Sequence, residues 1–360
     1  SMIDNELWST YILEVEPIGI DSINIIWEWH LWDHLVQDFD STKQNFGVVS
    51  QNPQLLDINY YFGNGKNDWL HCNSIDYNED LDQIVIGSRA LSELYIIDHS
   101  TTTIQASSNS GGNSNKGGDF LYRWGNPLAY DAVNTDQKLF GQHDVHWIDD
   151  SFLDSGKLLI FNNGKQRGYS SVDIVNPAVD SIGNYIIDSL NMFQPLNADW
   201  IYTSSPQQNF YSSYISGAQR LANGNTLICD GAHGDFFEID TVDNIVWRYV
   251  NPVLNTYILS QGDSIPVTQN GLGNSVFRCT KYPIDYSGFD NKDMTPSSPI
   301  ELNPIPDSCV MITSILPEIS NGKELIKIVD LMGRNTNQEH NSVLFYIYSD
   351  GTVEKIFKIF

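Results

Sequence analysis

Two histidines and a serine stand at matching places in three similar segments of the chain. His71 heads an apolar run, a polar turn and a second apolar run that ends at Arg89. His143 and Ser216 head two further segments of this kind, after steps of 72 and 73 positions. An imidazole is a good nucleophile and proton carrier near neutral pH, and a guanidinium holds oxyanions. Equivalent positions of a radial repeat face one axis, so the spacing predicts one shared site.

More polar residues accompany these anchors. Asn73 lies just inside the first segment, and Asn163 and Arg167 follow the second apolar run of the middle segment. We expect the long Arg167 side chain to reach back towards the axis after a short Asn-Gly turn. His233 belongs to the third segment, and we expect it at the opposite end of the strand pair from Ser216. Two imidazoles, an amide and a guanidinium at one axis would concentrate positive potential, which favours capture of an anionic substrate.

Each of these residues also has a purely structural interpretation. A single histidine in a core is usually satisfied by neighbouring strands, but two at equivalent repeat positions favour a function. For Arg89 and Arg167 the structural alternative is a solvated salt bridge. Each arginine follows an apolar strand, which places its guanidinium group near the rim of the radial repeat or near its axis. Trp27, Trp124 and Trp247 recur near the ends of strand groups and are predicted to be core residues.

The elements that must position these residues are short strands. Alternation and the β-branched and aromatic content predict three outer strand pairs, at 11–17 with 23–30, 94–98 with 120–124, and 236–240 with 244–249. With the inner pairs they make four-stranded units, which are the blades of a β-propeller. We find two complete blades, one unit split by a long insertion at 164–209, and a leading half-blade. The sequence thus predicts an all-β propeller that is incomplete at its N-terminus, or a ring that closes by pairing with another chain.

The bulk composition narrows the possible partners. With 45 acidic and 19 basic residues the chain has a formal charge of −26, which disfavours nucleic acid and anionic membrane surfaces. No apolar run approaches the ~20 residues of a membrane span. No signal peptide opens the sequence, where Ser1-Met2 resembles a cloning remnant. The four cysteines lack metal-site spacing and allow either one disulfide in an exported protein or four free thiols.

The C-terminal part has a different character. Prolines punctuate a predicted linker at 296–311, and alternating apolar runs follow it. Asp350-Gly351 between two of these runs is a hairpin-turn signal. We therefore predict a propeller over 1–295 and a small separate β-sandwich over 312–360.

Two parts of the sequence resemble known families. The stretch from Trp27 to Asn251 is similar to the bacterial arylsulfate sulfotransferase family, through Asp68-Trp69-Leu70-His71 with Asn73-Ser74, Ser88-Arg89, Gln142-His143, Phe161-Asn162-Asn163-Gly164 with Arg167, and Gly224-Asn225-Thr226-Leu227. Residues 312–360 resemble the C-terminal sorting module of the type IX secretion route, through Ile328-Val329-Asp330-Leu331-Met332-Gly333-Arg334 and Asp350-Gly351-Thr352-Val353.

The first resemblance implies a six-bladed propeller with its site in a central funnel. It also implies transfer of a sulfuryl group from a phenolic sulfate ester to a phenol through a histidine carrier, with no nucleotide or other cofactor. The partners would be a small-molecule aryl sulfate and a phenol acceptor, with neither nucleic acid nor a membrane span. The second resemblance implies export through the outer membrane to the medium or the cell surface, with the tail addressed to the secretion machinery.

The resemblance also assigns roles to residues. It makes His71, His143 and Arg167 catalytic, with Arg167 as the sulfate clamp. It implies no metal ligand, and the candidate substrate-binding residues are Asn163, Asn73, Arg89, Ser216 and His233. We expect the carrier histidine to head a further blade, but the third segment begins with Ser216. Either His71 or His143 is then the carrier, or the chain is a non-catalytic propeller that binds a glycan or a protein. A metal-dependent hydrolase would need three converging ligands, for which the sequence has no motif.

Overall fold

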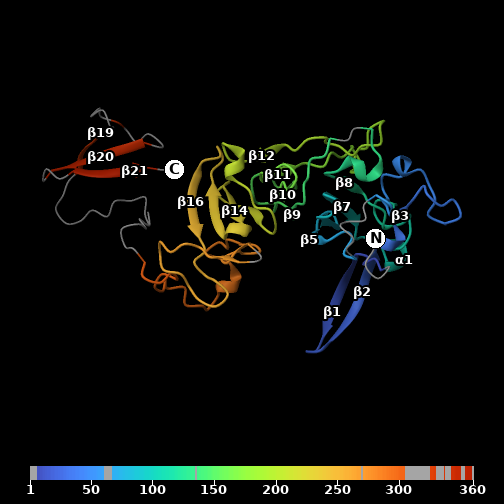
Figure 1. The fold of residues 1–360 in the computed structure, drawn as a ribbon, viewed down its shortest axis with the longest axis horizontal. Coiled ribbons are helices and arrows are strands. Elements are labelled where there is room, and N and C mark those ends of the chain that lie inside the picture. Colours follow the sequence, from blue (N-terminus) through green and yellow to red (C-terminus); the bar gives the residue numbers. More distant parts are fainter. Residues whose placement is uncertain are drawn as a thin grey trace. The chain divides into compact units, whose positions relative to one another are not determined.

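The computed structural model describes residues 6–60, 67–133, 136–268, 271–304, 325–329, 336, 342–349 and 353–358. It consists of two compact units, Ser1–Ile300 and Glu301–Phe360 (Figure 1). Regular structure is almost entirely β-strand, so the all-β prediction is confirmed. In the described ranges the only α-helix is α1 (Thr103–Ala106), and short 3-10 turns lie at Leu31–Asp33, Val49–Gln51, Pro127–Tyr130, Gln207–Asn209, Gly231–His233 and Ser287–Phe289.

Three four-stranded antiparallel sheets, here called blades, form most of the first unit. The strands of each blade follow one another in the chain and pair in that order, as in a propeller. The first blade has β5 (Cys72–Asn78), β6 (Gln83–Ser88), β7 (Glu93–Asp98) and β8 (Tyr122–Trp124). The second has β9 (His143–Trp147), β10 (Leu158–Asn162), β11 (Ser171–Val175) and β12 (Trp200–Tyr202). The third has β13 (Gly217–Arg220), β14 (Thr226–Asp230), β15 (Asp235–Ile239) and β16 (Ile245–Val250).

The predicted anchors lie at the starts of the first strands of the blades. His71 immediately precedes β5, His143 opens β9, and Ser216 immediately precedes β13. β9 packs against β5, and β13 packs against β9 and β10. The radial repeat predicted from the spacing of these residues therefore gives consecutive, adjoining blades.

The stretch 164–209, predicted as an insertion, contains the two outer strands of the second blade. β11 and β12 pair there through Val172 with Tyr202 and Ile174 with Trp200. The prediction missed them because β12 has only three residues and a long segment separates the two strands. That segment itself folds back through isolated bridges between Val179 and Tyr185 and between Ile187 and Phe193.

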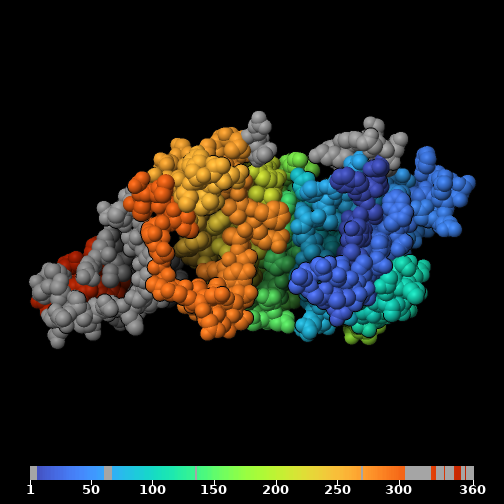
Figure 2. All heavy atoms as spheres, turned by 90° about the horizontal axis from the view of Figure 1, so that it is seen from below, coloured from blue at the N-terminus to red at the C-terminus, as the bar shows by residue number. Residues whose placement is uncertain are grey.

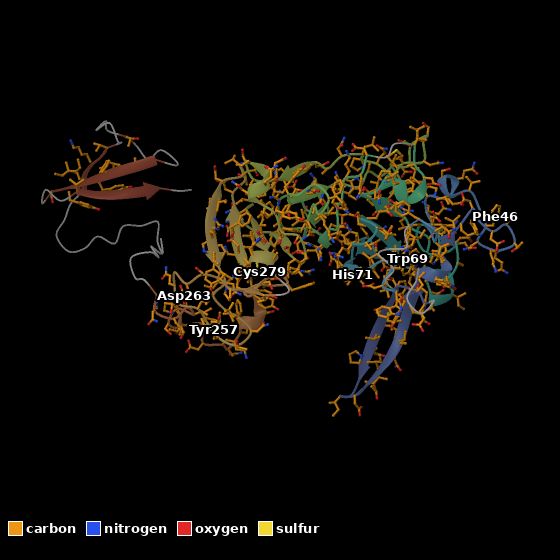
Figure 3. All side chains as sticks on the ribbon, viewed as in Figure 1. Phe46, Trp69, His71, Tyr257, Asp263 and Cys279 are labelled. Atoms are coloured by element: carbon orange, nitrogen blue, oxygen red, sulfur yellow. The ribbon has the colours of Figure 1, made fainter. Side chains whose placement is uncertain are left out.

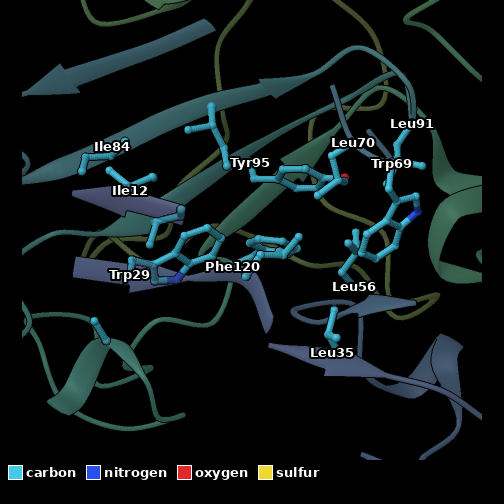
Figure 4. Close-up of a cluster of buried hydrophobic side chains, with 14 of the residues drawn as sticks. Ile12, Trp29, Leu35, Leu56, Trp69, Leu70, Ile84, Leu91, Tyr95 and Phe120 are labelled. Carbon is cyan, nitrogen blue, oxygen red and sulfur yellow. The ribbon is translucent and has the colours of Figure 1, made fainter. Parts of the chain in front are cut away.

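Hydrophobic contacts between neighbouring blades fix the positions of the inner strands. β6, β7, β10 and β11 are buried along their whole length. Each is covered on both faces, so the middle of β6, β7 and β10 is continuously apolar, whereas β11 has the buried Asp173 at its centre. In the core beside the first blade, Trp29, Tyr95 and Phe120 lie together (Figure 4), and the last two rings stack with centroids 4.3 Å apart. Two further clusters join the first blade to the second and the second to the third.

An ion pair is buried in the first blade. Arg123 of β8 donates from Nε to Glu93 Oε1 of β7 at 2.9 Å and from Nη2 to Oε2, and both side chains are fully buried. Arg123 Nη1 also donates to the carbonyls of Pro53 and Leu55, and the Tyr95 hydroxyl donates to Glu93 at 2.9 Å. Burial raises the pKa of Glu93, and the Arg123 charge opposes that rise. The pair ties two outer strands of the blade to the preceding loop.

The leading half-blade is a hairpin of β1 (Tyr11–Ile18) and β2 (Ser22–His30), as predicted. Its base is anchored by Ile12, Trp27 and Trp29, which are buried. Beyond a bulge between Glu14 and Val15 its side chains are exposed. In the described part of the chain this hairpin forms a sheet of two strands only.

The three tryptophans predicted to be core residues differ in their burial. Trp27 and Trp124 are buried, but Trp247 is 46% exposed and stacks on Tyr249. The prediction for Trp247 is wrong because β16 is the last strand of the third blade and most of its residues are exposed. A tryptophan near the end of a blade is therefore core only when another element covers that strand.

The remaining sheets are small. β3 (Leu35–Val36) pairs parallel with β4 (Leu56–Asp57), and β17 (Val267–Thr268) pairs antiparallel with β18 (Gly271–Leu272). The second unit contains an antiparallel sheet of β19 (Leu325–Val329), β20 (Ser342–Tyr348) and β21 (Val353–Lys358). Much of the sandwich and sorting motif predicted over 312–360 lies outside the described residues.

The described sheets do not close into a ring, because no strand of the third blade pairs with or packs extensively against the hairpin or the first blade. The six blades implied by the family resemblance are thus not all present in the described chain. No helix in the described ranges has the length and apolarity needed to cross a membrane.

Candidate functional site

One end of the blades gathers most of the candidate residues. In each blade the first strand pairs antiparallel with the second, so the start of one lies beside the end of the other. The register pairs Cys72 with Ser88, His143 with Phe161, and Gly217 with Cys229. We call this end, where β5, β9 and β13 begin and β6, β10 and β14 finish, the histidine end.

His143 is held in one tautomer by an asparagine. Its Nδ1 lies 2.7 Å from Asn163 Oδ1. The Asn163 amide nitrogen donates to the carbonyls of Ser212 and Ile215 at 2.8 and 2.9 Å, so the amide oxygen faces the ring and accepts from Nδ1–H. Nε2 then carries the lone pair. The arrangement presents a fixed, unprotonated ring nitrogen.

The charge state of His143 follows from its surroundings. Burial lowers its pKa to about 4, against the opposing effect of the hydrogen bond that Nδ1–H donates to Asn163. The charges of Arg89 and His71 lower it further, because they disfavour a third positive charge nearby. His143 is therefore neutral at pH 7, and it shares its surroundings with His71 and Arg89.

His71 forms a dyad with Asp68. Its Nδ1 contacts Asp68 Oδ2, and both side chains are almost half exposed. The carboxylate accepts from Nδ1–H and orients the ring, which leaves Nε2 available for proton exchange. Figure 3 shows His71 on the first blade where β5 begins. The charge of His71 also acts on the buried, neutral His143.

Arg89 supplies a positive charge at the histidine end. It follows β6, is half-buried, and donates its backbone N–H to the carbonyl of His71 at 3.3 Å. In the ranges that the structure describes, its guanidinium has no hydrogen bond or ion pair. A partly buried guanidinium without a carboxylate favours binding of an oxyanion.

Asn73 positions the backbone of the site. Its Nδ2 donates to the carbonyl of Gln142 at 2.8 Å. The Gln142 amide in turn donates to the carbonyls of Ser88 and Glu93 at 3.0 and 2.7 Å. Asn73 and Gln142 therefore fasten the residue before His143 to the first blade. The predicted role of Asn73 in substrate binding stays untested.

Arg167 is bonded to its own loop. Its Nε donates to the Tyr169 carbonyl at 3.1 Å and its Nη2 donates to Ser171 Oγ at 2.5 Å. The guanidinium lies over the Tyr169 ring, 4.4 Å from its centroid. No hydrogen bond or ion pair recorded for the described residues joins Arg167 to either histidine. The structure thus places Arg89, rather than Arg167, among the charges that act on His143.

Ser216 and His233 lie at the same end of the third blade. The buried Ser216 hydroxyl contacts Ser212 Oγ at 2.8 Å and accepts the Gly231 N–H at 3.0 Å, so it is engaged in the fold. Our prediction that His233 lies at the opposite end is wrong, because β14 runs antiparallel to β13 and returns to Ser216. His233 Nδ1 lies 2.8 Å from Asp230 Oδ1, and this bond raises the pKa of His233.

The carboxylate partners of His71 and His233 were not identified from the sequence, although the sequence contains a pattern that marks them. Asp68 precedes His71 by three positions, and Asp230 precedes His233 by the same number. A polar pair at this spacing is compatible with a tight turn that folds the carboxylate onto the ring. The repeated Asp-x-x-His pattern could have predicted both dyads.

The backbone at the histidine end is left-handed at a non-glycine residue in each blade. His71, Asp144 and Ser216 have φ values of +47°, +56° and +90°. Side chains with a Cβ rarely adopt this region, and such residues cluster at functional sites. The backbone is thus kinked where each inner strand begins, and the kink orients a polar side chain.

We expect His143 to make stability depend on pH in a defined window. Its folded-state pKa is about 4 and its ordinary value is 6.5, so between these values the unfolded chain binds the extra proton. Stability should therefore fall as the pH drops from 6.5 to 4, by up to about 3 kcal/mol from this residue. Urea unfolding of wild type and His143→Gln at pH 7.5, 6 and 5 measures it. Parallel losses in the two proteins would contradict the buried neutral ring.

Comparison with known proteins gives one family. The model of the arylsulfotransferase (ASST) family matches residues 11–259. Among curated proteins no sequence matches the chain.

Three solved structures show remote likeness. The β-propeller domain of Cps50 (Swd1) from Myceliophteria thermophila is 9% identical, with 50% of this chain and 43% of that chain covered and a TM-score of 0.31. BamB from Moraxella catarrhalis is 14% identical, with coverages of 52% and 40% and a TM-score of 0.27. A protein of unknown function from Bacteroides caccae is 13% identical, with coverages of 55% and 67% and a TM-score of 0.22. The chain spans less than half of the length of the first two.

The family match covers the hairpin, all three blades and the whole histidine end. It extends over more than two thirds of the 360 residues. The chain therefore belongs to the arylsulfotransferase family.

Proposed function

We propose that the histidine end transfers a sulfuryl group from a phenolic sulfate ester to a phenol, with His143 as the transient carrier. The observation that carries the proposal is that the two imidazoles lie in different environments. His143 is buried, neutral and held in the tautomer with an unprotonated Nε2, whereas His71 is exposed and paired with a carboxylate. Two like groups in such different environments suit the separate roles of nucleophile and proton carrier.

The first half-reaction uses both rings. His143 Nε2 attacks the sulfur, forms the S–N bond and breaks the bond between sulfur and the phenolic oxygen. The departing phenolate takes a proton from Nε2 of His71, whose ring Asp68 orients. Asn163 keeps accepting from Nδ1–H of His143 as positive charge develops on that ring.

The second half-reaction reverses these roles. His71, now unprotonated at Nε2, takes the proton of the incoming phenol while the phenol oxygen attacks the sulfur. The S–N bond breaks and its electron pair returns to His143. Protons and bonds therefore balance over the cycle, and both imidazoles end as they began.

The sulfuryl oxygens need a cation, and we assign this role to Arg89. Its guanidinium is unpaired in the described chain and its charge acts on His143. Arg167, the residue matched to the family clamp, donates to Tyr169 and Ser171 instead. Arg89 is therefore free to accept an anion without breaking an existing bond.

Steady-state transfer from 4-nitrophenyl sulfate to phenol tests this assignment. Arg89→Met should lower kcat/KM by roughly 30- to 1,000-fold, equivalent to about 2–4 kcal/mol, the cost of losing one preorganised donor. Arg167→Met is the matched comparison and should lose less. The assignment is wrong if Arg167→Met loses activity while Arg89→Met keeps it. The proposed reaction itself fails if wild type releases no nitrophenol with any phenol acceptor.

The competing function is a non-catalytic propeller that binds a glycan or a protein. The engaged hydroxyl of Ser216, where a third histidine was expected, favours it. A third possible function is metal-dependent hydrolysis. In the described ranges, no group of three His, Cys, Asp or Glu side chains could hold a metal ion. Nitrophenol release with wild type separates transfer from binding.

We also propose that the protein is exported and that residues 312–360 are the address read by the secretion machinery. The support is the sequence resemblance of that stretch to a sorting module, together with a separate C-terminal unit that begins at residue 301. Most of the motif lies outside the described residues. Fusing residues 301–360 to a reporter and measuring its release into the medium tests the proposal.

A further inference from the structure

A segment that follows the third blade returns and lies across one face of it. We call residues 274–281 the strap. Val276 N–H donates to the Gly231 carbonyl at 2.8 Å, and Ser216 N–H donates to the Phe277 carbonyl at 3.0 Å. Figure 2 shows the chain beyond residue 250, in orange, lying over the yellow strands of this blade. The strap therefore crosses the histidine end and continues along the blade.

The strap covers the face of the blade that carries Cys229. In the register, Cys229 lies opposite Gly217, and residues two positions apart on a strand share a face. Gln219 and Glu238 belong to that face, and both bond to Lys281 of the strap, at 2.8 Å from its N–H and 2.6 Å from its Nζ. The face bearing Cys229 is thus fastened directly to the strap.

Cys279 lies two residues before Lys281 and meets Cys229. The two thiols interact electrostatically, and Cys229 Sγ donates to the Val276 carbonyl oxygen at 4.0 Å. Gly217, opposite Cys229, has no side chain that could stand between them. Both cysteines are free thiols in this structure (Figure 3 marks Cys279).

The two thiols differ in a way that suits disulfide exchange. Cys279 is half-buried and lines an open cavity of about 280 Å³, whereas Cys229 is 1% exposed. The interaction with Cys229 lowers the pKa of Cys279, and the same interaction together with burial raises the pKa of Cys229. Cys279 is therefore the accessible attacking thiol and Cys229 the buried thiol that completes the bond.

We propose that Cys229 and Cys279 form a disulfide that staples the strap to the third blade when the protein meets a low-molecular-weight disulfide. The Cys279 thiolate attacks the oxidant, forms a mixed disulfide and expels one thiolate. Cys229 then loses its proton and attacks the Cys279 sulfur, expelling the second thiolate. Two electrons and two protons leave the pair, and the oxidant is reduced to two thiols.

The staple would act on the neighbouring blade as well. Arg278, next to Cys279, pairs with Asp144 Oδ1 at 3.0 Å, and the other Asp144 oxygen accepts the Ala218 N–H at 3.1 Å. Asp144 directly follows His143 in β9. A covalently held strap therefore keeps Arg278 on the second blade. The disulfide is inferred from this packing alone and holds whether or not the protein transfers sulfuryl groups.

Oxidised glutathione is the probe. Full-length protein is treated with oxidised or reduced glutathione, the remaining thiols are alkylated, and the digest is mapped by mass spectrometry. We expect a peptide linking Cys229 to Cys279, and a rise in Tm of about 5–15 °C because the bond closes a loop of roughly 50 residues. Cys72→Ser should behave as wild type, and Cys279→Ser should show neither the linked peptide nor the rise.

Different results would contradict the disulfide and its stabilising effect. Glutathione adducts on both cysteines without a linked peptide, or linkage of Cys279 to Cys309 instead, would overturn the proposal. A linked peptide without a rise in Tm would retain the disulfide and refute the staple. Because wild type is compared with itself in two redox states, poor folding of a serine variant does not obscure the result.

Discussion

Replacing His143 with alanine should lower kcat/KM for aryl sulfates by at least about 10³-fold, since the nucleophile of a covalent mechanism cannot be substituted by its neighbours. The ring is buried, so the variant also leaves a small cavity, and its folded state is checked by the unfolding transition. In a His143→Gly variant, added imidazole should restore part of the activity by taking the sulfuryl group itself. Wild type briefly mixed with aryl sulfate should carry a sulfuryl adduct on the peptide containing His143.

A second histidine variant distinguishes the two proposed roles. His71→Ala should lose more activity with phenyl sulfate than with 4-nitrophenyl sulfate, because a poor leaving group depends more on protonation. His143→Ala should lose activity with both substrates. If His143→Ala transfers within tenfold of wild type, and His71→Ala does not, then His71 is the carrier and our assignment is reversed.

Glu93→Ala should destabilise the first unit by about 3–5 kcal/mol, because it leaves the fully buried Arg123 guanidinium without its carboxylate. The carbonyls of Pro53 and Leu55 still accept from Arg123, but they carry no compensating charge. The loss should also reach the histidine end, since the Glu93 backbone holds Gln142. Urea unfolding at pH 7 measures the change in stability.

The double variant Glu93→Leu with Arg123→Met is the matched control. Removing both charges replaces an ion pair with apolar contacts, which is often close to neutral in a buried site. It should therefore recover most of the stability lost in Glu93→Ala. A single variant that costs less than 1 kcal/mol would mean that water reaches the guanidinium and that the pair is not truly buried.

The fold was predictable where strand pairs are long and their turns are marked. The third blade, with Asn223-Gly224-Asn225 between two apolar runs, could be placed almost to the residue. β12 could not, because three residues do not establish a period and its partner is distant in sequence. The exposure of Trp247 could not be predicted either, because it depends on what covers β16 and not on the sequence pattern of that strand.

The candidate site was predictable as a set of positions but not as a set of bonds. The nearly equal steps from His71 to His143 and from His143 to Ser216 predicted that these residues head inner strands, and in the structure the His71 charge lowers the pKa of His143. Which arginine can bind a substrate depends on whether its flexible side chain turns towards the solvent, the site or its own loop. Only the three-dimensional structure shows this orientation. Arg167 folds onto Tyr169 and Arg89 does not, and no spacing rule separates the two.

The left-handed residues at the strand entries set a limit on engineering. Glycine would occupy the backbone conformation of His71, Asp144 or Ser216 with less strain, by roughly 1 kcal/mol at each position. The buried hydrogen bonds of Asp144 and Ser216 oppose that gain, whereas the His71 side chain is almost half exposed, so a search for thermostable variants would tend to favour glycine at His71. It would gain a relaxed backbone and discard an imidazole in the same step. Selection for stability alone is thus expected to erode this end of the molecule first, and libraries built on this chain should hold these positions constant.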